Sequence, residues 1–425
     1  MPVRKRADER VARRAAAVTV VVSFAAVAIV AALLVPWAWV PGGHLVPASA
    51  SSLFTPDQIA RAERYSWWQR GLSWASYAVS LAVLAWFALS ATGSRVLHAL
   101  TQRRRWWLGV PLAALVVVVA QSLLTLPFGV VSHEVDRRYA ISHQSFAGWG
   151  LDRLTSLAVS WVITTLVLLA VVGFARRSPR WWFAWAGATA MVLTLAGSFL
   201  YPVVVEPLFN TFTPMQDGPF KQSILRLADK EGVHVDDVLV ADASRRTTTL
   251  NAYVSGFGST RRVVLYDNLL KDLPPRQILV IVAHELGHAK NQDVLLGTTL
   301  GAVGSVGAVA LLALVMDADG VRRRTRVSGA GDPASVGVLL ALAAAGALLV
   351  SPLQNTVSRA IETRADRESL AATHANATFV RMQRQLALRS LQDPTPPALS
   401  QFWWGTHPTV LQRAGLPSSL RRVGD

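Results

Sequence analysis

The residues best suited to chemistry form the segment His284-Glu285-Leu286-Gly287-His288. Two histidines four residues apart share one face of a helix, so their imidazoles can bind a single metal ion. The glutamate between them would lie beside that ion, where it can act on a bound water molecule. The preceding apolar residues, 278–283, indicate a buried helix, in which imidazoles without partners would be costly. The segment therefore predicts a metal site rather than two surface histidines.

A third ligand must come from elsewhere in the chain, since a catalytic zinc ion needs three protein ligands and one open position. Cysteine is absent, so histidine, aspartate or glutamate must supply it. The best candidate is Glu362, which shares a helical face with Asp366. Glu362 would ligate the metal, while Asp366 would orient a ligand histidine. Alternatively, both carboxylates would form ion pairs with Arg359, Arg364 and Arg367.

The composition indicates that these residues are held by a membrane protein. Of the 425 residues, 52% are hydrophobic and 16% are charged, whereas soluble domains carry roughly 25% charged residues. The mean hydropathy is +0.35. These values exclude an ordinary soluble enzyme and a disordered chain. The net charge of +16 comes largely from short basic runs beside apolar stretches, a pattern typical of membrane flanks rather than of a nucleic-acid binder.

Seven apolar runs are long enough to span a bilayer as helices, which predicts a mainly α, multi-pass protein of the cell membrane. We expect the first run to be an uncleaved helix, because no clear cleavage signal follows it. The runs cover Ala15–Val35, Trp74–Ala91, Trp107–Val131, Leu154–Phe174, Trp182–Val205, Val294–Met316 and Val336–Leu353.

Two polar segments contain the candidate site, and they divide the chain into four parts. Residues 1–205 hold the first five spans, 206–293 a soluble segment with the histidine-bearing helix, 294–353 the last two spans, and 354–425 a C-terminal soluble segment. Within the first soluble segment, the pattern predicts helices and short strands. The helices cover Phe220–Lys230 and residues 276–291, and the strands cover Asp237–Ala241, Asn251–Gly256 and Arg262–Tyr266.

Taken together, the motifs resemble the type I CAAX prenyl endopeptidases, integral-membrane zinc proteases of the sterile-mutant type and of the gluzincin class. The resemblance covers roughly Leu126 to Arg413. Six ordered blocks carry it: Leu126-Pro127-Phe128 with Ser132-His133; Tyr201-Pro202 through Pro207-Leu208-Phe209-Asn210 to Phe212-Thr213-Pro214; Asn251-Ala252-Tyr253 with Val263-Val264-Leu265-Tyr266-Asp267; the helix with both histidines; Ser358-Arg359 through Glu362 to Asp366; and Thr406-His407-Pro408 with Arg413.

The resemblance implies a role for each matching residue. His284, His288 and Glu362 match the ligands of one zinc ion, and Glu285 matches the general base. Asn251 matches the substrate-binding edge strand, and His407 and Arg413 match a pair near the active site. His407 would stabilise the oxyanion, and Arg413 is expected to bind substrate. The implied fold has seven transmembrane helices around an internal chamber, capped by an α+β metalloprotease segment.

The chain also departs from the family, and this affects the expected substrate. Family members often carry His-Ser before Asn-Ala-Tyr, where this chain has Thr249 and Leu250. The dominance of Arg and Ala suggests a bacterial source, in which prenylated proteins are not expected. We therefore predict an endopeptidase that cleaves non-prenylated peptides or membrane-associated proteins, in quality control or maturation. The alternatives are a non-proteolytic seven-helix transporter or a scaffold, although few ionisable residues lie in the spans.

The side of the membrane on which the site lies is left open by two conflicting indications. One side of the membrane would hold 17 Arg and Lys residues: 6 in the N-terminus, 4 in segment 92–106, 3 in 175–181 and 4 in 317–333. The opposite side would hold 6, with 3 each in the short segments 41–72 and 132–153. The charge rule therefore places the catalytic segments outside the cytoplasm. The family resemblance implies the reverse orientation. The sequence also leaves the oligomeric state open.

Overall fold

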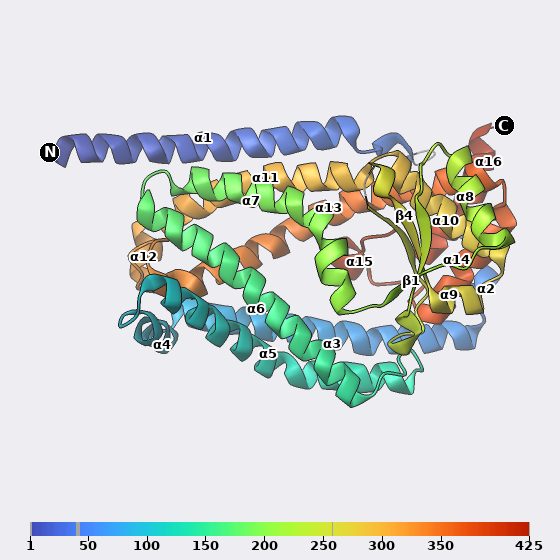
Figure 1. Ribbon diagram of the computed structural model, residues 1–425, viewed down its shortest axis with the longest axis horizontal. Helices are drawn as coiled ribbons and strands as arrows, with labels where there is room; N and C mark the ends of the chain where they lie inside the picture. Colours follow the sequence, from blue (N-terminus) through green and yellow to red (C-terminus); the bar gives the residue numbers. More distant parts are fainter. Residues whose placement is uncertain (1, 40–42, 257, 425) are drawn as a thin grey trace.

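The computed structural model describes residues 2–39, 43–256 and 258–424. A long bundle of helices forms one end of the molecule, and a small sheet with shorter helices forms the other (Figure 1). Within these residues, seven helices are long and apolar enough to cross a membrane, which confirms the predicted number of spans. These helices are α1 (Pro2–Leu34), α3 (Pro56–Leu89), α5 (Trp106–Arg138), α6 (Phe146–Arg177), α7 (Trp182–Leu200), α11 (Asp293–Met316) and α13 (Val336–Thr373).

Two of these helices extend well beyond the apolar runs. Helix α3 begins at Pro56 because Thr55 and Gln58 form a capping box there, so a polar stretch precedes its apolar part. Helix α13 runs without a break to Thr373 and therefore joins the last span to the segment that contains Glu362.

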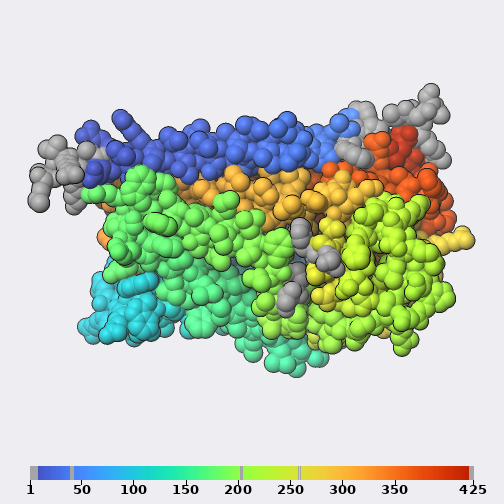
Figure 2. All heavy atoms as spheres, turned by 45° about the horizontal axis from the view of Figure 1, so that its top comes forward, coloured from blue at the N-terminus to red at the C-terminus, as the bar shows by residue number. Residues whose placement is uncertain are grey.

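Neighbouring helices form a closed ring of contacts. Along the ring, α13 packs on α3, α3 on α5, α5 on α6, α6 on α7, α7 on α11, and α11 again on α13. This is the arrangement expected around an internal chamber. Helix α1 lies outside the ring along α11, where it forms one face of the molecule (Figure 2).

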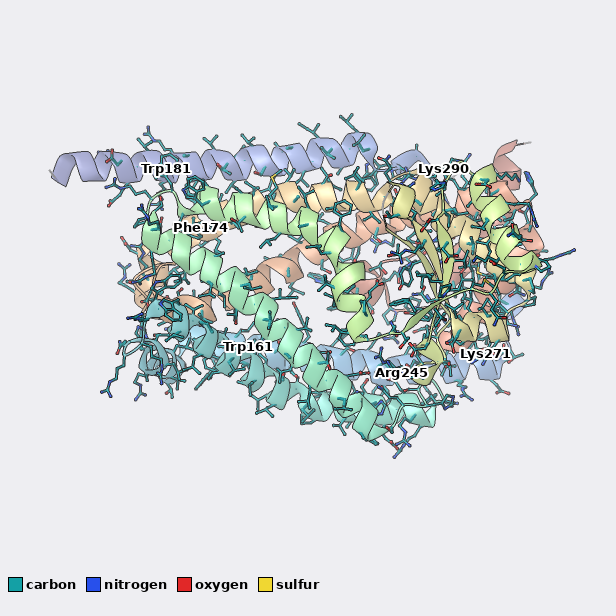
Figure 3. The ribbon with its side chains drawn as sticks, in the orientation of Figure 1. Trp161, Phe174, Trp181, Arg245, Lys271 and Lys290 are labelled. Atoms are coloured by element: carbon teal, nitrogen blue, oxygen red, sulfur yellow. The ribbon has the colours of Figure 1, made fainter. Side chains whose placement is uncertain are left out.

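The outer surface of the bundle is apolar. Val22, Leu123 and Leu349 are 60%, 61% and 71% exposed, respectively. Exposing this much apolar surface to water would cost free energy, whereas contact with lipid does not carry that cost. Figure 3 shows Trp161, Phe174 and Trp181 on the bundle, whereas Arg245, Lys271 and Lys290 lie at the end that contains the sheet.

The polar segments fold into one compact unit around a four-stranded sheet. The strands β1 (Phe212–Pro214), β2 (Asp237–Ala241), β3 (Ala252–Ser255) and β4 (Arg262–Tyr266) have the spatial order β1-β2-β4-β3. Strands β2 and β4 are parallel, and the other pairs are antiparallel. Strand β3 therefore lies at an edge of the sheet, and none of the other described strands pairs with its outer side. The short strand β1, which contains a proline, was not predicted.

Shorter helices complete this unit and connect the spans. Fully buried side chains of α8, α10, α14 and β4 form its core, including Ile224, Leu286, Phe379 and Leu265. The shorter helices are α2 (Ala50–Leu53), α4 (Ala91–Thr101), α8 (Pro219–Lys230), α9 (Asp267–Asp272), α10 (Pro275–Lys290), α12 (Asp319–Thr325), α14 (Asn376–Ser390), α15 (Ala398–Trp404) and α16 (Val410–Gly424). A single π-helical turn, Tyr201–Val205, continues α7 towards the sheet.

Candidate active site

Helix α10 carries both histidines of the candidate site. Pro275 is its first residue, a position where proline costs no hydrogen bond, and its apolar face packs into the core around the sheet. The helix ends at Lys290, and Gln292 adopts a left-handed backbone conformation that turns the chain into α11. Helix α10 also packs on α13. The two chain segments predicted to hold the metal ligands are therefore neighbours.

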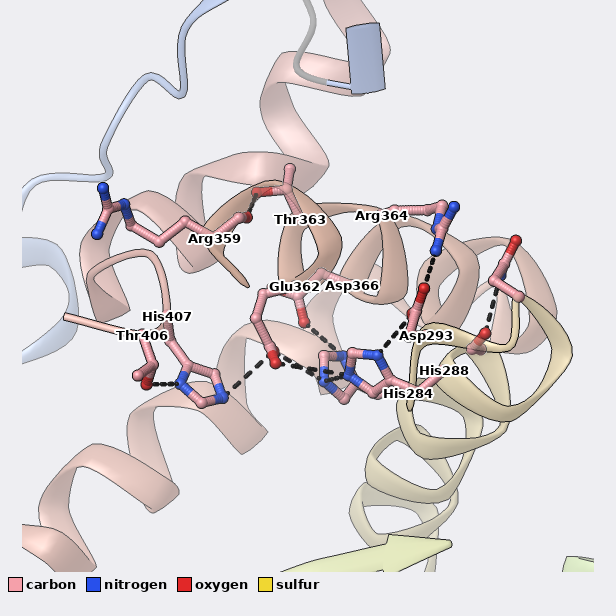
Figure 4. Close-up of polar contacts among 12 residues, drawn as sticks. His284, His288, Asp293, Arg359, Glu362, Thr363, Arg364, Asp366, Thr406 and His407 are labelled. Carbon is pink, nitrogen blue, oxygen red and sulfur yellow. Dashed lines mark hydrogen bonds and ion pairs between the residues drawn. The ribbon is translucent and has the colours of Figure 1, made fainter. Parts of the chain in front are cut away.

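Three side chains converge on one point between these helices (Figure 4). Nε2 of His284 lies 3.1 Å from Nε2 of His288 and 3.2 Å from Oε2 of Glu362. Nε2 of His288 lies 3.6 Å from Oε1 of Glu362. A tetrahedral zinc ion with ligands at 2.0–2.1 Å would separate its ligand atoms by about 3.3 Å. The three side chains thus have the spacing that such an ion requires.

The protonation of the two imidazoles gives a second reason to place a cation here. Nδ1 of His284 lies 2.9 Å from Asp366, and Nδ1 of His288 lies 2.9 Å from Asp293. A carboxylate at Nδ1 fixes the proton on that nitrogen and leaves Nε2 as an acceptor. Two acceptor nitrogens then face the buried Oε2 of Glu362, to which none of the described residues donates a hydrogen bond. A cation between them removes this repulsion.

Without a metal, the same carboxylates would hold a proton on His284. Burial alone would lower the pKa of His284, but the adjacent carboxylates of Asp366 and Glu362 raise it to about 10. A proton and a metal ion therefore compete for this imidazole.

The contact between Asp293 and His288 was not predicted from the sequence. Asp293 is the first residue of α11, and it also accepts a hydrogen bond from the guanidinium of Arg364 on α13. The two ligand histidines therefore each have a buried carboxylate behind them, from two different helices. Such partners fix the orientation of the imidazole.

Arg413 lies behind the site and does not line the pocket. Its guanidinium donates two hydrogen bonds to Asp366, of 2.7 and 2.6 Å, in a bidentate pair. The other arginines near Glu362 are also occupied elsewhere. Arg364 pairs with Asp293, and Arg359 donates to the carbonyl oxygens of Gln401 and Gly405. These two arginines therefore do not form the alternative ion pairs with Glu362 and Asp366.

A pocket of about 530 Å³ opens in front of the three ligands. Glu285 lines it, and burial raises the pKa of this carboxyl above its ordinary value, as suits a general base.

His407 lines the same pocket from the loop before α16, with its Nε2 atom 3.3 Å from Oε2 of Glu362. The side chain of His407 is 48% exposed, and its partial desolvation in the pocket lowers its pKa, which favours the neutral imidazole. Nδ1 of His407 lies 2.8 Å from the hydroxyl of Thr406.

The edge of the sheet reaches the same pocket. Asn251, Ala252 and Tyr253 line it, where strand β3 begins. The carbonyl of Asn251 accepts a hydrogen bond from the amide of Tyr266, which ties this end of the edge to β4. Leu250, at the departure from the family pattern, is buried in the core and does not line the pocket.

A helical membrane bundle that ends in a histidine–histidine–glutamate metal site with an adjacent glutamate defines the class of membrane-integral metallopeptidases. Comparison with known proteins agrees with this class. Residues 42–211 match the family "CAAX prenyl protease N-terminal, five membrane helices", and residues 214–415 match peptidase family M48. The chain belongs to this membrane-integral group of M48 metallopeptidases.

Individual relatives show how far the similarity extends. The uncharacterized metalloprotease YhfN of Bacillus subtilis is 29% identical over 383 residues, which cover 86% of this chain and 87% of YhfN. CAAX prenyl protease 1 of Saccharomyces cerevisiae is 31% identical over 169 residues, covering 39% of this chain and 37% of the yeast protein. The crystal structure of S. mikatae Ste24p has the same fold. Its TM-score is 0.75 at 20% identity, with 94% of this chain and 98% of the other covered.

Proposed function

We propose that this protein is a zinc-dependent endopeptidase whose active site is the pocket in front of α10. The observation that carries the proposal is the convergence of His284, His288 and Glu362 within one pocket that also contains Glu285. Two imidazole nitrogens and one carboxylate oxygen form the ligand set of known zinc peptidases, and this set leaves one position open. We propose one zinc ion per chain. It would supply a Lewis acid that activates water and polarises the scissile carbonyl.

Glu285 serves as the general base in this proposal. Its carboxylate accepts a proton from the attacking water and later delivers it to the leaving amine. The raised pKa of Glu285 helps both steps, because a stronger base accepts the proton more readily and the acid form persists long enough to return it. Asp293 and Asp366 hold the protons on the Nδ1 atoms of the two ligand histidines.

His407 and the edge strand would act on the substrate itself. With Nδ1 facing the hydroxyl of Thr406, the neutral His407 can donate from Nε2 to the developing oxyanion. An extended peptide can add a strand along β3, beginning beside Asn251. Arg413 would act through Asp366, by fixing the carboxylate that orients His284, rather than by binding substrate.

The proposed substrates are polypeptides without a prenyl group, in membrane-protein quality control or in maturation. The names of several relatives refer to CAAX prenyl proteases, but the dominance of Arg and Ala in this chain suggests a bacterial source, in which prenylated proteins are not expected. We expect a prenylated and an unprenylated peptide of one sequence to be cleaved with similar kcat/KM. A strong preference for the prenylated peptide would refute this part of the proposal.

We further propose that the active site faces away from the cytoplasm. The arginine-rich segments that connect the spans lie together at the end opposite to the sheet (Figure 1). Three contacts join them: Arg180 pairs with Asp8 at 3.1 Å, Arg176 donates to the carbonyl of Gly331, and Arg326 donates to the carbonyl of Leu89. Short basic loops are retained in the cytoplasm. Because the structure places these loops on one side of the bundle, as the charge rule assumes, the proposal follows that rule rather than the orientation that the family resemblance implies.

The absence of cysteine makes this orientation simple to test. Gln222 on α8 is exposed near the sheet, and Ser328 is exposed at the arginine-rich end. We expect a membrane-impermeant maleimide to label the Gln222→Cys variant in intact cells, and the Ser328→Cys variant only after the membrane is opened. The opposite labelling pattern would place the active site in the cytoplasm.

The peptidase itself is tested by incubating the purified, detergent-solubilised protein with an unbiased peptide library and reading the products by mass spectrometry. The Glu285→Gln variant is the matched control, because it changes the side chain by one atom and leaves the three ligands intact. We expect internal cleavage by the wild type and none by the variant. Equal cleavage by both proteins would remove Glu285 from the mechanism.

A further inference from the structure

One carboxylate in the active-site pocket has no task in the proposed reaction. Glu206 follows the π-helical turn at the end of α7 and lines the same pocket as Glu285 and the three ligands. One of its oxygens, Oε2, accepts a hydrogen bond of 3.0 Å from the hydroxyl of Tyr253. Tyr253 belongs to β3, the strand along which we expect the peptide to bind. Glu206 is thus placed beside the path of the substrate.

Glu206 also has no positive partner of its own. Among the described residues, no lysine, arginine or histidine forms an ion pair with it. Burial raises the pKa of Glu206, and the hydrogen bond from Tyr253 offsets this effect only in part. A partly buried carboxylate without a counter-ion is costly, and such groups commonly serve binding or catalysis.

The charge of the whole pocket points in the same direction. Glu206, Glu285 and Glu362 each contribute a carboxylate, and no lysine or arginine is among the described residues that line the pocket. A divalent ion on the ligands offsets two of these three negative charges. A pocket that keeps an excess of one sign attracts groups of the opposite sign.

A structural role for Glu206 would not account for its charge. A neutral glutamine would accept the hydrogen bond from Tyr253 equally well, because that bond needs only an oxygen acceptor. The carboxyl group itself is therefore the feature that requires an explanation.

We propose that Glu206 makes the pocket selective for a lysine or arginine side chain of the substrate, at a position close to the scissile bond. This inference rests on the proposed peptidase function and names the class of peptide that it cleaves. The basic side chain would pair with the carboxylate of Glu206 while Tyr253 continues to orient it. The pairing would supply the counter-ion that the free protein lacks.

Peptide series that differ at a single position test this selectivity. Each position around a cleaved bond carries lysine, arginine, glutamate or the uncharged norleucine in turn. We expect one position at which peptides with lysine or arginine have a kcat/KM roughly tenfold to a hundredfold above that of the norleucine peptide. This is the range that a hydrogen bond to a charged group typically contributes. Glu206→Gln should abolish this ratio, and Glu206→Lys should favour glutamate. Asp242→Asn removes a carboxylate that pairs with Arg245 outside the pocket, and it should keep the wild-type ratio.

Two results would overturn the inference while leaving the peptidase intact. One is a wild type that cleaves without any basic preference, and the other is a Glu206→Gln variant that keeps the preference. A wild type that cleaves no peptide would instead refute the proposed function. Binding can then be measured without turnover on zinc-loaded Glu285→Gln protein. The fluorescence anisotropy of labelled lysine and norleucine peptides gives their affinities, which are compared between this protein and the same protein that also carries Glu206→Gln. Equal affinity for both peptides would overturn the role of Glu206 independently.

Discussion

Oδ2 of Asp293 lies 2.9 Å from Nδ1 of His288, across the break that separates α10 from α11. The residue that opens a membrane span thereby supports a metal ligand on the preceding helix. Because Arg364 on α13 holds the same carboxylate, three helices meet behind one imidazole. The orientation of His288 thus depends on the packing of the bundle as well as on its own helix.

Replacing Asp293 by asparagine should weaken metal binding while the protein stays folded. Loss of a carboxylate behind a ligand histidine typically costs about 10–100-fold in metal affinity or activity. Competition with a zinc-chelating dye measures the affinity. Asp272→Asn provides the control, because Asp272 pairs with Arg389 away from the site. An affinity unchanged in Asp293→Asn would mean that His288 is oriented without this carboxylate.

Zinc affinity should rise with pH in the neutral and mildly alkaline range. The pKa of His284 is raised to about 10 in the metal-free protein, so this imidazole is protonated at pH 7 and must lose its proton to bind zinc. The affinity should therefore increase about tenfold per pH unit between pH 7 and 9 and level off near the pKa. Zinc titrations in buffers of graded pH measure this slope.

The Asp366→Asn variant provides the matched comparison for that slope. Asp366 is a main cause of the raised pKa of His284, so its removal should shift the rise in affinity to lower pH. A pH-independent affinity in both proteins would contradict the assigned competition between the proton and the metal.

Replacing His407 by alanine should slow catalysis without removing the metal. A donor to the oxyanion is worth about 2.7–4 kcal/mol, or 10²–10³ in kcat, since it acts mainly in the transition state. KM and zinc content should stay close to the wild type, because the three ligands lie on α10 and α13. Steady-state kinetics with metal analysis provides both readouts. A large rise in KM at constant kcat would show instead that His407 binds the ground state.

Much of the fold could be predicted because membrane spans have a simple requirement. A run of apolar residues long enough to cross the bilayer is visible in one sequence, and all seven were found. Their ends were predicted less well. Helix α3 begins 18 residues before the predicted Trp74, because a capping box and a polar stretch extend it beyond the apolar run.

The site was predictable where its residues share a helix. His284 and His288 are related by helical spacing, and so are Glu362 and Asp366. Asp293 escaped prediction because it lies five residues after His288, a spacing that places it on another face of a continuous helix. The left-handed Gln292 breaks that helix and brings the carboxylate back towards the ligand. The pairing of Arg413 with Asp366 joins residues 47 positions apart, which no local pattern reveals.

Metal dependence is the central claim, and it is tested most directly by removing and restoring the metal. Protein treated with a chelator and then dialysed should cleave no peptide. Activity should return in proportion to added zinc and reach a plateau at one equivalent per chain, and Glu362→Ala protein should not recover at that ratio. Full cleavage by protein shown to be free of metal would contradict the account, as would full zinc binding by Glu362→Ala, because the third ligand would then lie elsewhere.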